Sequence, residues 1–160
     1  MAVKITRDEL PRLRAAIRAL TNHRIMVGIP STTAGRTDTP VTNAVIGYVQ
    51  EHGNPATNLP ARPFLNPGVK AVEDQVVARL EHAGGLALDG DAAAIDRAFH
   101  AIGLLAVSSV RKVMTDRIPP PLAEATLRQR RARGRTGTVP LIDKGFLRNS
   151  ITYIIRRKRK

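Results

Sequence analysis

Residues 91–121 read DAAAIDRAFHAIGLLAVSSVRKVMTDRIPPP, and they carry the longest helical periodicity in the chain. Asp91 can open a helix, and three consecutive prolines from Pro119 to Pro121 must end it, because proline lacks the backbone donor that a helix needs. Between these limits apolar side chains recur in steps of three and four residues, at Ile95, Phe99, Ile102, Ala106, Val110 and Val113. This spacing predicts a long helix with one buried face.

Two short apolar stretches flank this helix at a distance and predict strands. Residues 24–29, RIMVGI, and residues 150–155, SITYII, are rich in β-branched side chains. Both faces of the first stretch are apolar, which favours a central strand, and Pro30 ends it. We expect the two stretches to pair antiparallel in one sheet.

Four further helices are expected from capping and periodicity. The first runs from Thr6 to Leu20, where Thr6 and Glu9 fit a capping box. The second runs from Thr42 to Gly53. The third follows Asn66 and Pro67 and is closed by Gly84 and Gly85, with Val69, Val72, Val76 and Leu80 on one face. The fourth is short and basic, from about Leu122 to Arg133.

The remaining segments predict loops around a single domain over residues 1–160. Residues 30–41 are rich in Ser, Thr, Gly, Pro and Asp and predict a mobile loop. Four prolines among the fourteen residues from Asn54 to Pro67 forbid a regular helix and predict a Pro-rich arm or loop over 54–66. We therefore predict an α+β fold, a small antiparallel sheet packed by several helices, with a long Pro-rich arm or loop and a basic tail at 156–160.

The composition excludes several classes of site. The chain has no cysteine, so it forms no disulfide and offers no thiolate ligand or cysteine nucleophile. Aromatic residues make up only 3% of it and Trp is absent, which argues against a platform for stacking bases. No apolar run approaches the roughly 20 residues of a membrane span. The expectation is a protein without a membrane partner, made in a cytoplasm.

The positive charge is concentrated at one end of the sequence. The chain carries a formal charge of +13, of which residues 128–160 contribute +11 and the first 127 residues +2. This asymmetry predicts a polyanionic neighbour, either nucleic acid or an acidic protein surface. The candidate residues are Arg128, Arg130, Arg131, Arg133, Arg135, Arg156 and Arg157. The alternative is a solvated basic face.

No arrangement typical of catalysis is present. The histidines lie in four separate predicted elements and none is spaced to share a metal, and the carboxylate pairs Asp8-Glu9 and Glu73-Asp74 fall in first turns of helices, where they complement the helix dipole. The chain also lacks the phosphate-loop, nucleophile-elbow and HExxH patterns. We therefore predict no enzyme, no cofactor and no metal site.

Three segments in order resemble the signature of a tailed-phage neck family, the head-to-tail joining, tail-completion or virion-morphogenesis proteins. They are LPARPFL at 59–65, PPLAEATL at 120–127 running into arginines, and PLIDKGFLRNSITY at 140–153. Together they span about residues 43–155. Lys144 stands where that family usually has Thr, and Ala123 where Ser is common.

The resemblance implies a structural virion protein at the neck or tail top, a subunit of a homo-oligomeric ring between portal or connector and tail tube or terminator, through which genomic DNA passes. Arg62, Pro63, Phe64 and Leu65 are candidates for a subunit interface; the alternative is that Phe64 and Leu65 fill the core of their own chain. Two other functions stay open. One is a tail terminator or minor tail protein, and the other a small non-specific nucleic-acid-binding protein.

Overall fold

The computed structural model of this 160-residue chain describes residues 9–31, 40–116 and 118–158. Thr6, which was predicted to cap the first helix, lies outside the described residues, as do residues 32–39 of the predicted loop and residues 159–160 of the basic tail. The described elements are, in chain order, α1 (Leu10–Thr21), β1 (His23–Gly28), α2 (Asn43–His52), the 3-10 turn η1 (Pro55–Thr57), α3 (Leu65–Lys70), α4 (Glu73–Leu88), α5 (Ala94–Thr115), α6 (Glu124–Ala132), α7 (Phe146–Asn149) and β2 (Thr152–Arg157).

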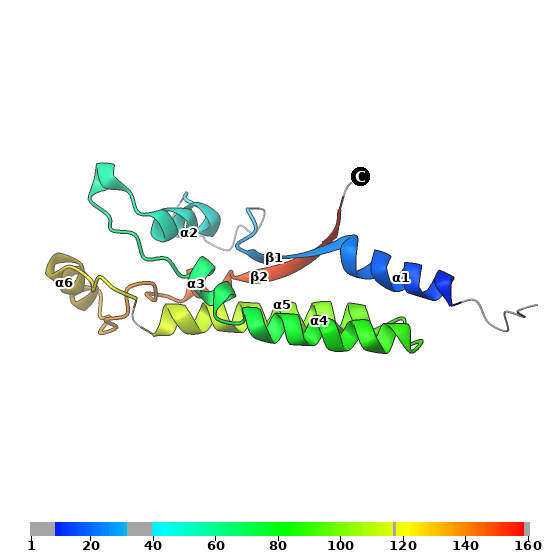
Figure 1. The fold of residues 1–160 in the computed structure, drawn as a ribbon. Coiled ribbons are helices and arrows are strands. Elements are labelled where there is room, and N and C mark those ends of the chain that lie inside the picture. Colours follow the sequence, from blue (N-terminus) through cyan, green and yellow to red (C-terminus); the bar gives the residue numbers. More distant parts are fainter. Residues whose placement is uncertain (1–8, 32–39, 117, 159–160) are drawn as a thin grey trace, which may run out of the picture.

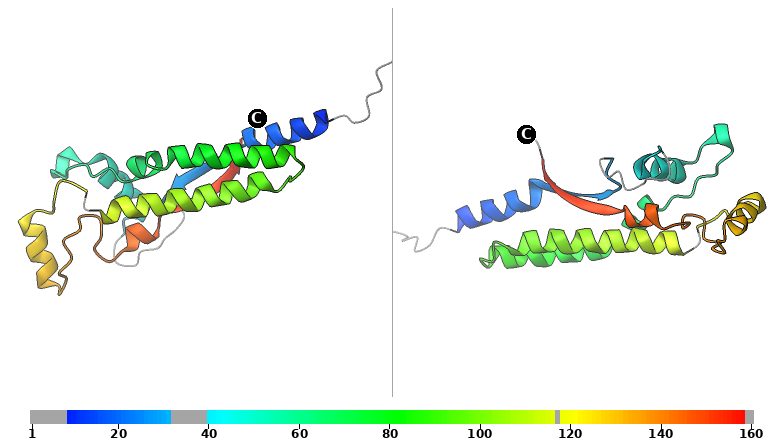
Figure 2. Two further views of the ribbon diagram at one scale, coloured as in Figure 1. Left: turned by 60° about the horizontal axis from the view of Figure 1, so that its bottom comes forward. Right: turned by 180° about the vertical axis from the view of Figure 1, so that it is seen from behind.

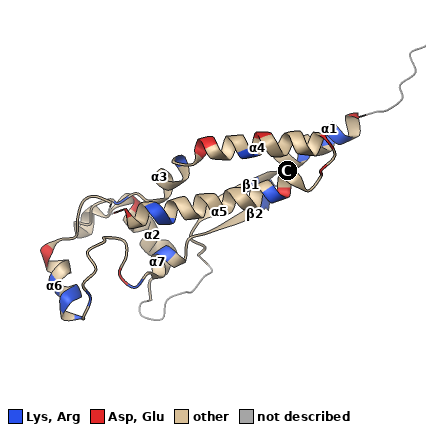
Figure 3. Cartoon of the chain, turned by 90° about the horizontal axis from the view of Figure 1, so that it is seen from below, with Lys and Arg blue, Asp and Glu red and all other residues tan. Residues whose placement is uncertain are grey.

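These elements form an elongated α+β fold, as predicted (Figure 1). The helices α4 and α5 lie side by side along the length of the molecule, and the ribbon of β1 and β2 packs on α5 (Figures 2 and 3). Helix α1 projects at one end and α6 lies at the other. Because α5 contacts α3, α4 and both strands, the fold is arranged around this one helix.

Helix α5 confirms the helix predicted from the 91–121 stretch. It begins at Ala94, ends before the prolines, and buries a continuous side that includes Ile95, Phe99, Ile102, Ala106, Val107, Val110 and Met114. Asp91 stands just before the helix, where a hydrogen bond from the side chain of Arg97 lowers the pKa of its carboxyl group below the usual value. The periodicity located this helix because all of its apolar stripe is used for packing.

The two predicted strands pair antiparallel as expected, but the prediction of a central strand was wrong. The sheet has two strands, with Ile25 opposite Ile155 and Met26 opposite Ile154. Burial alternates along β1, so Ile25 is partly buried against the helices while Met26 is 45% exposed. Helices pack on one face of this ribbon, and Met26 and Ile154 on the other face are exposed, as antiparallel sheets permit.

The helix predicted after Pro67 is in fact two helices. Helix α3 ends at Lys70, and α4 begins at Glu73 and runs through Gly84 and Gly85 to Leu88. Each glycine inside a helix costs about 1 kcal/mol relative to alanine. The packing of Ala83 and Ala87 offsets this cost, and the turn at Gly90, with φ 110°, ends the segment instead.

The ends of α2 follow the prediction. Thr42 accepts a hydrogen bond from the backbone N–H of Val45 at 3.4 Å, and Gly53 takes a φ of 76° after the last turn. The basic helix predicted over 122–133 is present as α6, whereas the short helix α7 was not predicted. Four residues carry too few periodic positions to be recognised from sequence.

The structure does not show the long arm expected for residues 54–66. Asn54 and Leu59 exchange backbone hydrogen bonds of 2.8 and 3.0 Å, which fold the first half of the segment into a loop around η1. The second half returns to the core, where Arg62 and Phe64 are buried. Proline prevented regular structure here, as predicted, but did not keep the segment away from the body of the protein.

Two apolar clusters hold the described elements along α5. One joins α1, α4 and α5 through Ala16, Ala87, Ile95 and Phe99. The other lies around the second half of α5 and consists of Phe64, Val107, Val110, Met114, Leu141, Leu147 and Ile151, which we call the Phe64 cluster. The stability of the ribbon and of the segments around α3 therefore depends on α5.

Gly68 permits the close approach of α3 to α5, and replacing it should destabilise the protein. A Cβ added at Gly68 would lie 2.6 Å from the Cα of Val110, a backbone atom that cannot move aside alone. We expect Gly68→Ala to lower the free energy of unfolding by about 2 kcal/mol. Urea denaturation of the purified chain, followed by circular dichroism, measures this change.

Gly85→Ala is the matched control, because a Cβ there meets nothing within 4 Å and its backbone is helical. This change should raise the free energy of unfolding by up to about 1 kcal/mol. Equal effects of the two substitutions would contradict the close contact between α3 and α5.

Candidate functional site

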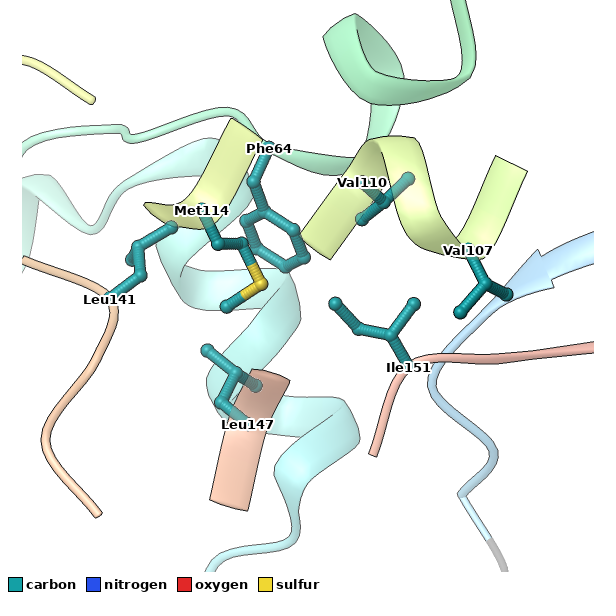
Figure 4. Packing of buried hydrophobic residues seen from close by; sticks show 7 residues of the cluster. All are labelled: Phe64, Val107, Val110, Met114, Leu141, Leu147 and Ile151. Carbon is teal, nitrogen blue, oxygen red and sulfur yellow. The ribbon is translucent and has the colours of Figure 1, made fainter. Parts of the chain in front are cut away.

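The Phe64 cluster brings together two of the three segments that resemble the phage neck family. Phe64 comes from the segment 59–65 and is 2% exposed, while Leu141, Leu147 and Ile151 come from the segment 140–153. Their side chains converge with those of α5 in one packed group (Figure 4). Residues far apart in the sequence thus form a single structural unit.

Arg62 joins the third segment to this unit. Its Nε donates to the carbonyl oxygen of Pro120 at 2.8 Å, and its Nη2 donates to that of Pro121 at 3.1 Å. The residue is only 5% exposed, and this burial lowers the pKa of its guanidinium group. A buried arginine is tolerated when carbonyl oxygens accept hydrogen bonds from its N–H groups. Arg62 therefore fastens the proline segment to the core.

Glu51 fixes the start of α3 and was not singled out in the sequence. Its carboxylate accepts hydrogen bonds from three backbone N–H groups, those of Phe64 at 2.7 Å, Leu65 at 2.9 Å and Asn66 at 3.1 Å. The sequence predicts a helix that follows Asn66 and Pro67, but the helix begins at Leu65 and its N-cap residue Phe64 makes no side-chain capping hydrogen bond. A carboxylate from α2 takes that role, and no local sequence pattern reveals a cap supplied from another helix.

The residues predicted for a subunit interface divide into two groups. Arg62 and Phe64 are buried within their own chain, so the alternative that Phe64 fills its own core describes this residue correctly. Pro63 is exposed and Leu65 is partly buried against the Phe64 cluster. Contact with another subunit through this segment stays a prediction, and Pro63 is the side chain that solvent reaches.

The predicted basic residues also divide, because Arg130 and Arg135 are engaged inside the chain. Arg130 has a side chain only 11% exposed, and its Nη1 donates to the carbonyl oxygens of Gly137, Val139 and Ile142 at 2.9, 3.1 and 3.1 Å. Arg135 forms an ion pair with Asp143. Arg130 therefore holds the loop that follows α6 against that helix, and Arg135 joins two parts of the loop to each other.

Arg128, Arg131 and Arg133 are exposed on or just after α6, a helix that buries none of its residues. Arg156 and Arg157 are exposed on β2, whose far end lies toward α1. The exposed arginines of α6 and those of β2 are therefore far apart in space, although both belong to the C-terminal excess of charge (Figures 1 and 3).

The histidines lie apart, and three of them make contacts of their own. The Nδ1 atoms of His23 and His52 lie 2.9 and 3.0 Å from the carbonyl oxygens of Ala19 and Tyr48. Nδ1 of His100 lies 3.0 Å from the hydroxyl oxygen of Tyr153. Across residues 9–31, 40–116 and 118–158, no group of three or more His, Asp or Glu side chains is placed to hold a metal ion.

No helix in the described part of the chain is both long and apolar enough to cross a bilayer. Comparisons of the chain with protein-family profiles, with curated proteins and with solved structures found no match.

The division of the arginines predicts different effects for two neighbouring substitutions. Arg130→Ala should release the loop over 134–143, because three carbonyl oxygens lose their shared donor. We expect amide hydrogen exchange in this loop to accelerate by about tenfold, since each 1.4 kcal/mol of lost stabilisation gives that factor. Arg131→Ala, at an exposed position one residue later, should leave the exchange unchanged. Equal protection in both variants would contradict the anchoring role of Arg130.

Proposed function

We propose that this chain is a non-enzymatic structural protein of a tailed-phage particle, a neck or tail-completion subunit that forms a ring between head and tail. The observation that carries the proposal is the convergence of the three resembling segments through Phe64, Arg62 and their partners. The segments that resemble one family in order also pack on one another and form one structural unit. This supports the resemblance, because chance matches have no reason to meet in space.

The surface of α6 suits contact with DNA that must move. Its exposed arginines can neutralise phosphates without reading base sequence, and such contacts allow DNA to slide. Helix α6 itself carries no aromatic side chain, which agrees with phosphate contacts that do not involve stacking on bases. In a ring, symmetry would repeat the cationic helix around a channel or against an acidic neighbour.

The two other candidate functions have distinct signatures. A tail terminator or minor tail protein would share the ring habit and lie against the tail tube. A small nucleic-acid-binding protein would bind DNA as a monomer, and the exposed arginines of α6 are the observation that favours it.

Localisation in intact particles tests the proposed function. An antibody against the chain, applied to purified virions and to separated heads and tails, should label the junction of head and tail in immunogold electron microscopy. Cross-linking should yield contacts with portal, connector or tail-top proteins. Label at the tail tip or along the tube would favour the minor tail protein, and absence of the chain from particles would overturn the proposal.

The cationic surface of α6 is tested by reversing its exposed charges. The triple variant Arg128→Glu, Arg131→Glu, Arg133→Glu should lower infectious titre by about tenfold or more, because phosphate or acidic contacts are lost. If each arginine meets one phosphate, the salt dependence of DNA binding by the purified chain should become shallower by a slope of about 3.

The matched control reverses three exposed arginines elsewhere, Arg14, Arg18 and Arg79. Unchanged titre in the α6 variant would rule out a role for this surface. A lowered titre with an unchanged salt slope would assign the surface to an acidic neighbour instead of DNA.

A further inference from the structure

The ribbon of β1 and β2 leaves one face exposed, and the centre of that face is apolar. Met26 and Ile154 are direct cross-strand partners, 45% and 38% exposed. A groove of about 440 Å³ runs beside them, lined also by Gly28, Pro30 and Thr152. Contiguous exposed apolar area is where another chain binds most readily, and this pair with its groove is such an area on the ribbon.

A pair of like charges flanks this apolar centre. Arg24 lies directly opposite Arg156 in the register of the ribbon, and both side chains are exposed. Like charges at directly opposed positions destabilise a strand pair. Within the described residues neither arginine forms an ion pair. An anionic group placed between the two guanidinium groups would remove the repulsion.

Helix α4 carries the complementary chemistry. It has three carboxylates, Glu73, Asp74 and Glu81, against one arginine, Arg79, in a chain whose formal charge is +13. Side chains spaced by three, four and seven residues share one side of this helix, where Val77 is 49% and Leu88 is 48% exposed. We call this set, Asp74, Val77, Glu81 and Leu88, the α4 strip.

The spacing of charge and apolar groups agrees between the two surfaces. Along the ribbon, two residues separate the Arg24–Arg156 pair from the Met26–Ile154 pair, a distance of about 7 Å. Along α4, four residues separate Glu81 from Val77, a rise of about 6 Å. A helix laid along the ribbon could thus place its carboxylate between the arginines and its valine on the apolar pair.

These two surfaces cannot meet within one molecule, because the exposed face of the ribbon points away from the layer of α4 and α5 (Figures 1 and 3). We propose that copies of this chain bind one another through two different surfaces. The exposed face of the ribbon of one copy contacts the α4 strip of the next copy. Such a contact joins two different surfaces, and when repeated it builds a ring where the rotation between copies closes and a filament where it does not. The inference deepens the proposed ring-forming function and rests on it for closure.

Neutral substitutions test the contact from both sides. One variant combines Arg24→Gln with Arg156→Gln, and the other combines Asp74→Asn with Glu81→Gln. Native mass spectrometry and light scattering of the wild-type chain should show oligomers. Each variant should raise the dissociation constant by about tenfold or more, because one partner of each charge pair is gone. Circular dichroism checks the fold of the variants, whose changed side chains are exposed.

Mixing the two variants gives the decisive result. Each retains one intact surface, so an equimolar mixture should form a 1:1 heterodimer and stop there, since the remaining surfaces are both disabled. The triple variant Arg24→Glu, Arg156→Glu, Glu81→Arg exchanges the charges and should recover self-association. The controls Arg79→Gln and Glu124→Gln neutralise exposed charges outside the contact and should assemble as the wild type does.

Three results would overturn the contact: a wild-type chain that stays monomeric, variants that assemble normally, or a mixture without heterodimer. A monomeric wild type would leave the ribbon face to an acidic segment of another protein. The experiments can refute the proposed contact and the proposed neck function independently. Localisation at the junction with normally assembling variants refutes the contact alone, whereas heterodimers from a chain absent from particles refute the function alone.

Discussion

The ring of Phe64 lies in a cluster with Val107, Val110 and Met114 of α5, which Leu141, Leu147 and Ile151 complete. Burying an aromatic side chain of this size contributes about 2–3 kcal/mol. The contact needs Gly68, which lets α3 approach the backbone of α5. The Phe64 cluster also holds the segment that precedes α3 and Ile151, the residue directly before β2. Arg62, two residues before Phe64, joins the proline segment to it.

Charged side chains hold the irregular backbone in place by hydrogen bonds to its N–H and C=O groups. Long segments without regular structure leave N–H and C=O groups that need partners when they are buried. Glu51 supplies the acceptor for three N–H groups, while Arg62, Arg111 and Arg130 supply donors to carbonyl oxygens. Arginine suits this role because its guanidinium group donates in several directions at once. Part of the basic excess of the chain is therefore structural.

The remaining charge lies on separate surfaces of the molecule. Exposed arginines stand on α6 at one end, a like-charge pair stands on the outer face of the ribbon, and carboxylates lie along α4. A chain of high net charge repels copies of itself, so any ordered assembly requires local complementarity between surfaces. An elongated subunit with different surfaces on different faces is compatible with a ring. The proposed neck function requires such a ring.

The sequence by itself determined the elements whose residues carry their own signal. Periodicity located α5, β-branched runs located both strands, and Thr42 and Gly53 marked the ends of α2. Only the tertiary structure decided the rest. Helix α4 continues through two glycines because its packing outweighs propensity, Glu51 caps a helix that is distant in sequence, and Arg130 differs from Arg131 solely in what lies beside it. Burial and partners are properties of the folded chain, so residue type alone could not distinguish an anchoring arginine from one that solvent reaches.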